Sequence, residues 1–210
     1  PPPPPPLFQA EDGIRDMPTG LVGSEMCIRD SVGGNTDAFG FLANLDDGAP
    51  GWRDAGAPAL VIGAGGAARA VLVALLDAGL AEIRLANRTA AKAEALAATL
   101  DPARIAVVSW TERHAAAAGV GMLVNAGSLG MAGHPPLDLD LAELPATAVV
   151  TDLVYAPLQT PLLAAAGARG NRAVDGLGML LHQARPGFAA WFGVEPVVDA
   201  ALRQAVLAGG

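Results

Sequence analysis

The segment LVIGAGGAARA, residues 60–70, decides the fold of this chain. A short apolar run typical of a buried strand meets a cluster of glycines, and a small-residue segment typical of a helix follows. Gly63, Gly65 and Ala68 fit the G-x-G-x-x-G/A pattern of a turn that binds dinucleotides. The first glycine of such a turn permits the bend, and the second lets a pyrophosphate approach the backbone. The helix N-terminus then offers free N–H groups to the phosphates.

The rest of the sequence repeats the order strand, helix, strand. Apolar runs of four or five residues alternate with segments of helical character, and turn sequences separate them. This alternation predicts an α/β, Rossmann-type fold, with a doubly wound parallel sheet covered on both faces. The predicted strands are residues 59–62, 82–86, 105–109, 122–125, 148–152 and 172–175. The predicted helices are residues 67–78, 90–100, 111–118 and 197–207, with others opening at Thr160–Pro161 and after Gly176.

A further helix is expected ahead of the first strand, because the sequence GGNTDAFGFL reads as a loop running into a helix. Its N-terminal cap is Asn35, Thr36 or Asp37. The expected buried face consists of Phe39, Leu42 and Leu45. A turn-rich linker at residues 46–51 then leads toward the sheet.

Composition limits the classes of function. The chain has 210 residues, and its formal charge of −8 argues against general binding of nucleic acid or anionic membranes. No apolar run reaches the length of a bilayer span, and a single cysteine allows no internal disulfide, so a cytoplasmic protein is expected. His114, His134 and His182 are too scattered to predict a metal site. His182, beside Gln183, is expected at the surface or next to the site.

The first 31 residues differ in character from the rest. A run of six prolines is followed by residues 9–16 and 21–31, which resemble translated sequencing adapters in frame and in library order. We therefore expect residues 1–31 to be non-native, with native sequence starting near Val32 and the front of the gene lost. Cys27 lies in this foreign tract, so the native part is expected to lack cysteine.

The end of the second predicted strand indicates which cofactor binds. An NAD-binding turn places a carboxylate there, about twenty residues past the glycines, to accept a hydrogen bond from the ribose 2′-hydroxyl. This sequence instead has Asn87, Arg88 and Thr89, with Lys92 one helical turn further on. Arginine can bind a 2′-phosphate bidentately, and lysine adds positive charge. The sequence therefore favours NADP(H) over NAD(H).

Polar residues also follow the later strands. Asn125 ends the fourth strand and begins a segment of small residues placed to meet a cofactor at the switch point of the sheet. Ser128 has no histidine near it in sequence, so nucleophilic catalysis is not supported. Taken alone, Tyr155 and Gln183 are as expected for polar groups at the rim of a core.

Taken together, the motifs resemble the shikimate dehydrogenase family over nearly all of residues 32–210. Six motifs occur in the order typical of that family, which makes the resemblance specific. They are GNTD (34–37), GAGGA (63–67), NRT (87–89) with Lys92, NAGSLGM (125–131), DLVYAP (152–157) with TPLL (160–163), and GLGML (176–180) with Gln183–Ala184.

The resemblance implies an oxidoreductase that reduces 3-dehydroshikimate to shikimate with NADPH, reversibly, in aromatic amino-acid biosynthesis. It implies that Asp37 is catalytic and that Asp37, Tyr155 and Gln183 bind the substrate. The implied cofactor contacts are Gly63, Ala64, Gly65, Gly66, Ala67, Asn87, Arg88, Thr89, Lys92, Asn125, Leu153, Gly176 and Met179. It also divides the chain into a remnant of a substrate-binding domain (32–54), an NADP-binding domain (55–180) and C-terminal helices that pack back toward the substrate domain (181–210).

Two departures from the family pattern bear on activity. The family's catalytic lysine lies upstream of the NTD motif, and nothing before Val32 resembles the domain that carries it, so most of the substrate-binding domain is expected to be missing and the fragment inactive. Gly127 also stands where the family usually has threonine. The alternatives are a non-catalytic NADP-binding module, an enzyme acting on quinate, and an enzyme using NAD. A homodimer is a further expectation that the sequence leaves open.

We predict that Arg88→Ala weakens NADPH binding by about 10- to 100-fold and changes NADH binding by less than about twofold, because only NADPH carries the 2′-phosphate. Titration of both cofactors against both proteins measures the effect. Equal losses for the two cofactors would contradict the assignment of Arg88 to the 2′-phosphate.

Overall fold

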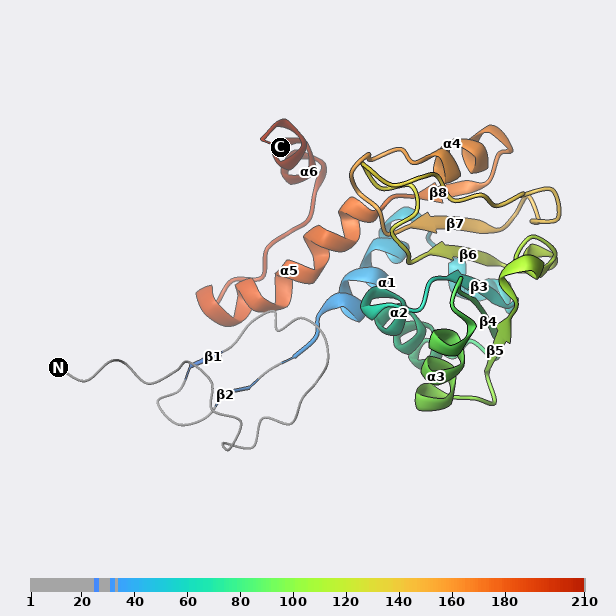
Figure 1. Cartoon of the computed structure of the whole chain (residues 1–210). Helices are drawn as coiled ribbons and strands as arrows, with labels where there is room; N and C mark the ends of the chain where they lie inside the picture. The colour runs from blue at the N-terminus through green and yellow to red at the C-terminus, as the bar shows by residue number, and fades with distance from the viewer. Residues whose placement is uncertain (1–24, 27–30, 33, 210) are drawn as a thin grey trace.

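The computed structural model describes residues 25–26, 31–32 and 34–209, and its centre is a six-stranded parallel sheet (Figure 1). The strands of this sheet are β3 (Ala59–Ile62), β4 (Ile83–Ala86), β5 (Ile105–Val108), β6 (Met122–Asn125), β7 (Val149–Asp152) and β8 (Arg172–Val174). They lie in the order β5-β4-β3-β6-β7-β8, and every neighbouring pair is parallel. The predicted Rossmann-type fold is therefore confirmed.

Most of the segment expected to be non-native lies outside the described residues. At its end, β1 (Glu25–Met26) pairs with β2 (Ser31–Val32), which crosses the expected boundary, in an antiparallel ladder of two residues each. That ladder is separate from the six-stranded sheet.

The two faces of the sheet are covered differently. One face packs on α1 (Asp37–Gly48), α2 (Gly66–Asp77), α3 (Ala90–Leu100) and the start of α5 (Gly176–Phe192). The other packs on α4 (Pro161–Ala168), the residues around two 3-10 turns, η2 (Trp110–Glu112) and η3 (Ala115–Ala117), and the loop around Leu137–Leu144. Successive residues of a strand point to opposite faces of the sheet. Val61 and Val124 pack in the apolar core on the face of α1 and α2, and Leu60 and Leu123 pack in the core on the face of α4. A third 3-10 turn, η1 (Trp52–Ala55), precedes β3.

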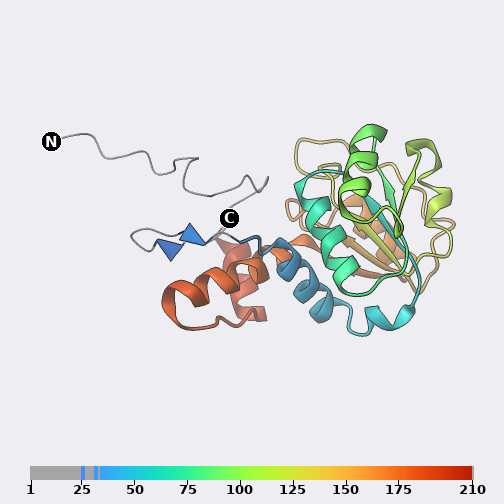
Figure 2. The ribbon, with the colours of Figure 1, turned by 90° about the horizontal axis from the view of Figure 1, so that it is seen from below.

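Helices α1 and α5 pack against each other at very short range. In Figure 2, α1 lies between the sheet and the C-terminal part of α5. A Cβ atom on Gly40 of α1 would lie 2.7 Å from the Met179 carbonyl oxygen and 2.8 Å from the Gln183 Cβ. One turn further along α1, the buried Asn44 amide donates to the Asp175 carbonyl at 2.8 Å and fills the space in front of Gly178. Glycines on both helices thus allow backbone contact, and one amide fixes the register of α5 against α1.

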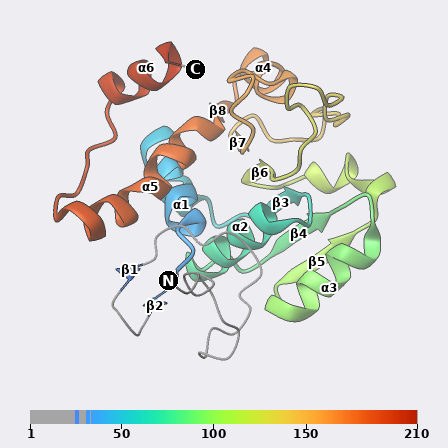
Figure 3. The same ribbon diagram turned by 60° about the vertical axis from the view of Figure 1, so that its left-hand side comes forward.

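Three sequence expectations for the helices are wrong in detail. The buried face of α1 consists of Gly40, Phe41, Asn44 and Leu45, whereas Phe39 is 41% exposed, because α5 approaches on the side of the glycine. The helix expected at 111–118 is instead the pair of 3-10 turns η2 and η3. The last helix, expected at 197–207, begins three residues later; this helix, α6 (Ala200–Ala208), buries none of its residues and lies away from the sheet in Figures 1 and 3.

The ends of the other predicted elements agree with the structure to within one or two residues, and β3, α3 and β6 agree fully. Thr160 caps α4 as expected, accepting from the Leu163 N–H, with Pro161 at the first helical position. Among the described residues, no helix is both long and apolar enough to cross a membrane.

We predict that Gly40→Ala lowers the free energy of unfolding by about 1–3 kcal/mol, because the new methyl group would meet backbone atoms of α5 that cannot move aside. Gly187→Ala, in α5, is the matched control, since a Cβ at Gly187 meets nothing within 4 Å. The control should gain up to about 1 kcal/mol from the better helix propensity of alanine. Urea unfolding of the three proteins measures both values, and an unchanged stability of Gly40→Ala would contradict the close crossing.

Candidate functional site

A pocket of about 500 Å³ lies at the carboxyl ends of the parallel strands, where β3 and β6 meet. This is the switch point of the sheet, because the chain leaves β3 toward one face and β6 toward the other. The lining contains one charged side chain, Arg88, and no carboxylate among the described residues. It comprises Ile62, Gly63, Ala64, Gly65, Gly66, Ala67, Asn87, Arg88, Trp110, Asn125, Ala126, Gly127, Ser128, Leu129, Met131, Leu153, Val154, Tyr155 and Ala156.

The glycine turn between β3 and α2 forms the centre of the pocket. Gly63 has a φ of 115°, and a Cβ there would lie 3.0 Å from the Ala126 carbonyl group, so both backbone shape and space require glycine. Gly65 faces open space, since a Cβ on it meets nothing within 4 Å. The first turn of α2 has no acidic residue and no side-chain cap. Its N–H groups are thus available to an anion, and the turn fits a pyrophosphate.

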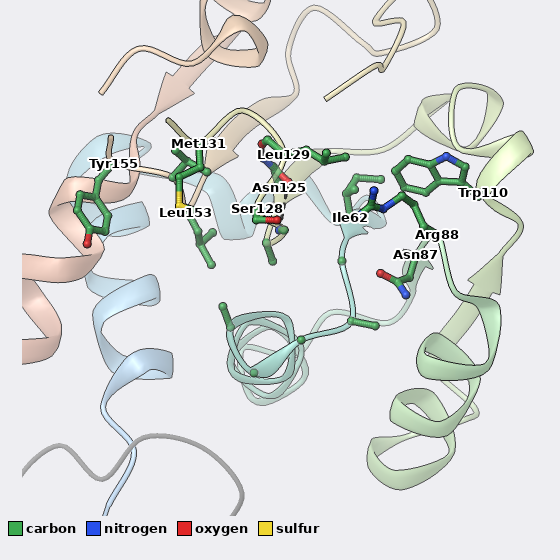
Figure 4. Close-up of a pocket in the computed structure, with 18 of the residues that line it drawn as sticks. Ile62, Asn87, Arg88, Trp110, Asn125, Ser128, Leu129, Met131, Leu153 and Tyr155 are labelled. Carbon is green, nitrogen blue, oxygen red and sulfur yellow. Dashed lines mark hydrogen bonds between the residues drawn. The ribbon is translucent and has the colours of Figure 1, made fainter. Parts of the chain in front are cut away.

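One end of the pocket combines a cation with an aromatic ring. Arg88 extends from the end of β4 toward the Trp110 indole (Figure 4), and no ion pair engages Arg88 among the described residues. The buried Arg113 guanidinium lies 4.5 Å from the centre of the Trp110 ring and is itself held by Asp138 at 2.9 Å. The Asn87 amide donates to the Thr89 carbonyl at 2.9 Å and shapes the turn that presents Arg88.

The sequence did not identify Trp110 as a pocket residue. It follows a strand at the start of a 3-10 turn, and no spacing rule connects it to Arg88 in the neighbouring β4–α3 turn. The parallel pairing of β4 with β5 brings these two segments to the same edge of the sheet. The position of Trp110 just past the carboxyl end of a strand was the only signal in the sequence that it could line the pocket.

At the other end of the pocket, a hydrogen-bonded network supports the lining loops. The Asn125 amide donates to the Leu129 carbonyl and to the Asp152 carboxylate, each at 2.9 Å. The second Asp152 oxygen accepts from the Thr160 hydroxyl at 2.7 Å. Burial raises the pKa of the fully buried Asp152 carboxyl above its ordinary value, and the hydrogen bonds from Thr160, Val154 and Asn125 partly oppose this rise.

The residues implied to bind substrate come from three elements. Asp37 opens α1, and Gly40, one turn later on the same side of that helix, lies directly against Gln183 of α5. Asp37 therefore lies one helical turn from the residue of α1 that packs against Gln183. Tyr155 is 51% exposed and stands at the end of the pocket nearest these helices (Figure 4).

Four of the implied cofactor residues do not line the pocket. Thr89 occupies the N-cap position of α3 without a side-chain hydrogen bond, and Lys92 is exposed on the first turn of that helix. Gly176 packs directly behind the Leu153 carbonyl, where any side chain would overlap backbone, and Met179 is buried in the core. Gly127 has room for a side chain, because a Cβ there makes only ordinary contacts, the nearest 3.5 Å from the Asn125 carboxamide oxygen.

His182 is not at the surface, contrary to one sequence expectation. It is 4% exposed, and its Nε2 lies 3.0 Å from an Asp47 carboxylate oxygen, joining α5 to the end of α1. The reason is the close α1–α5 crossing, which covers the face of α5 that carries the histidine. Among the described residues, no three His, Cys, Asp or Glu side chains gather as a metal site would require.

The fold and the pocket define the class of protein: a Rossmann-type dinucleotide-binding protein. Residues 52–129 match the family model described as shikimate / quinate 5-dehydrogenase. The chain is 55% identical over 193 residues to the shikimate dehydrogenase (NADP(+)) of Rhodospirillum rubrum, an alignment that covers 90% of this chain and 68% of that protein. The chain belongs to the shikimate dehydrogenase family.

Two solved structures extend the comparison. Quinate dehydrogenase from Corynebacterium glutamicum in complex with NAD superposes with a TM-score of 0.78 at 32% identity, covering 86% of this chain and 64% of that one. Shikimate 5-dehydrogenase from Thermus thermophilus in complex with NADP(H) and shikimate gives 0.71 at 36% identity, covering 83% and 62%. The chain thus spans about two thirds of the length of the relatives it matches.

We predict that the stability of the wild type relative to Asp152→Asn declines as the pH rises from the ordinary carboxyl pKa through the raised pKa of Asp152. A raised carboxyl pKa means that the folded state holds its proton more tightly than the unfolded state. The stabilisation is therefore complete at low pH and is lost as the pH rises through the folded-state pKa. Urea unfolding at several pH values measures the free energy of unfolding of each protein. Asn171→Ala changes no ionisable group, so its free energy of unfolding should differ from that of the wild type by a constant amount at every pH. Parallel stability curves for the wild type and Asp152→Asn would contradict the shift.

Proposed function

We propose that this chain forms the cofactor-binding part of an NADP-dependent shikimate dehydrogenase, which interconverts 3-dehydroshikimate and shikimate in aromatic amino-acid biosynthesis. The observation that carries the proposal is Arg88, the one charged side chain of the pocket, at the end of the strand next to the glycine turn. The chain's membership of the shikimate dehydrogenase family and the names of its relatives support the same function.

Arg88 selects the cofactor in this proposal. An NAD-specific site needs an acceptor for the ribose 2′-hydroxyl, and a carboxylate there would repel a 2′-phosphate. The pocket lining has no carboxylate, and Arg88 has no competing ion pair among the described residues. A guanidinium in this position can hold the phosphate through two parallel hydrogen bonds. The Trp110 ring beside Arg88 offers an apolar surface to the adenine base.

Asp37, Gln183 and Tyr155 hold the substrate in this proposal. The bound cofactor supplies the hydride that reduces the substrate ketone. Asp37 orients the reacting oxygen together with a lysine that protonates it, and Gln183, which packs against Gly40 one turn along α1 from Asp37, binds a substrate hydroxyl. We place this lysine in the third of the relatives' length that the chain does not match. We therefore propose that the 210-residue chain by itself binds the cofactor but does not turn over substrate.

An apolar surface on the C-terminal helices supports the same division into domains. Phe188 and Phe192 of α5 stack with ring centres 4.5 Å apart, and Trp191 beside them is 58% exposed. The exposed apolar side chains here and on α6 are Phe188, Trp191, Phe192, Val194, Val197, Leu202, Val206 and Leu207. We propose that the substrate-binding domain of the whole enzyme covers this surface. Self-association of the chain through the same surface is the competing arrangement.

Two alternatives to this function have separate grounds. A quinate dehydrogenase that uses NAD is favoured by the similarity to the Corynebacterium glutamicum enzyme. A non-catalytic NADP-binding module is favoured by the extent of the match, which includes the cofactor pocket but only part of the relatives' length.

The experiment that tests the proposal joins, ahead of Gly34, the whole part of the Rhodospirillum rubrum relative that precedes its counterpart of Gly34. We expect the joined protein to reduce 3-dehydroshikimate with NADPH, and the 210-residue chain to bind NADPH without turnover. In the joined protein, Asp37→Asn should lower kcat/KM by about 10²- to 10⁴-fold, because it removes the carboxylate that orients the proton donor.

Steady-state rates with both substrates and both cofactors separate the alternatives. Faster turnover of quinate with NAD would replace the proposed substrate and cofactor. A joined protein that folds and binds NADPH but converts neither substrate would support the non-catalytic module.

A further inference from the structure

Asp152 is a buried carboxylate that does not line the pocket but holds the segments that do. It ends β7, and its side chain is fully buried. One oxygen accepts from the Asn125 amide at 2.9 Å and from the Val154 N–H at 3.0 Å, and the other accepts from the Thr160 hydroxyl at 2.7 Å. These donors compensate for the desolvation of the carboxylate, which is why the group is tolerated in the interior.

Each of these hydrogen bonds constrains a different part of the pocket. The Asn125 carboxamide also donates to the Leu129 carbonyl and accepts from the Gly127 N–H, so it sets the course of the loop after β6. The Val154 N–H belongs to the loop after β7, which carries Leu153 and Tyr155 into the pocket. Thr160 stands directly before α4, and its hydroxyl also caps that helix. One carboxylate therefore joins two pocket loops and the start of a helix.

The opposite end of the pocket is built independently. Asn87 and Arg88 follow β4, and Trp110 follows β5, on the other side of the central strand β3. The hydrogen bonds that hold that end run to the Thr89 carbonyl and, through Arg113, to Asp138. Among the described residues, no hydrogen bond connects that end to Asp152.

We propose that Asp152 is a positioning residue for the nicotinamide half of the cofactor site. In a doubly wound sheet, a dinucleotide bound across the switch point with its 2′-phosphate at Arg88 places its nicotinamide over the loops after β6 and β7. Asp152 holds both loops in the conformation that receives the ring. This role rests on the proposed NADP(H) site. It adds that separate hydrogen-bond networks organise the 2′-phosphate half and the nicotinamide half of that site.

The test compares ligands that occupy one half or both halves of the site. NADPH fills the whole site, whereas adenosine 2′,5′-bisphosphate fills only the half next to Arg88. We expect Asp152→Asn in the full chain to weaken NADPH binding about tenfold, because hydrogen bonds that hold both loops are lost. Its affinity for adenosine 2′,5′-bisphosphate should stay within about twofold. The emission of bound NADPH, which reports the surroundings of the nicotinamide, should move toward that of the free cofactor.

Three further variants control for a structural effect. Thr160→Val, which removes one donor to Asp152, should reproduce the selective loss in part, and Thr160→Ser should retain wild-type binding. Asn171→Ala removes a buried amide that donates to the Pro145 and Ala148 carbonyls, away from the pocket lining. It should lower stability and leave the ratio of the two affinities unchanged.

The outcomes separate this inference from the proposed function. If Asp152→Asn and Thr160→Val change the affinities for both ligands by the same factor, or change neither, the positioning role is wrong while the cofactor site stands. If the wild-type chain binds neither NADPH nor adenosine 2′,5′-bisphosphate, the proposed NADP(H) site itself is wrong.

Discussion

The parallel pairing of β3 with β6 is the interaction on which the rest of the structure depends. It sets Ile62 opposite Asn125, and the Ala126 N–H donates to the Ile62 carbonyl at 2.9 Å just beyond the two strands. From that point the chain turns to opposite faces of the sheet and leaves a crevice between the strand ends. Gly63 is required there because the Ala126 backbone is close and its φ is positive. The pocket, the open space at Gly65 and the uncapped start of α2 all follow from this geometry.

Charge is distributed around this pocket in a way that suits an anionic ligand. The net charge of the chain is −8, yet the lining has an arginine and no carboxylate among the described residues. The buried carboxylate that supports the site, Asp152, lies behind the loops, and its oxygens accept from internal donors. Repulsion of a dinucleotide is thereby limited, while the backbone N–H groups and Arg88 remain available.

The elements predicted from the sequence were those whose signal is local. β3 and β6 are short apolar runs bounded by turns, and α4 begins with a threonine cap and a proline. Arg88 was also found from sequence, because its distance from the glycine turn is set by one helix and one strand. Trp110, the burial of His182 and the glycine face of α1 were not predicted. Each depends on a neighbour from another part of the chain, as His182 depends on Asp47, 135 residues away.

The sequence by itself determined the fold class, the glycine turn and the place of Arg88 one strand away from it, since these rest on residue type and spacing within one strand–helix–strand unit. Only the tertiary structure decided which side chains meet. It brought Trp110 beside Arg88 through the pairing of β4 with β5, and Gln183 against Gly40, one turn from Asp37, through the glycine crossing of α1 and α5. It also made Asp152 the common acceptor of two loops and a helix. Contacts of this kind join segments far apart in the chain, and their selection depends on packing and strand order rather than on local pattern.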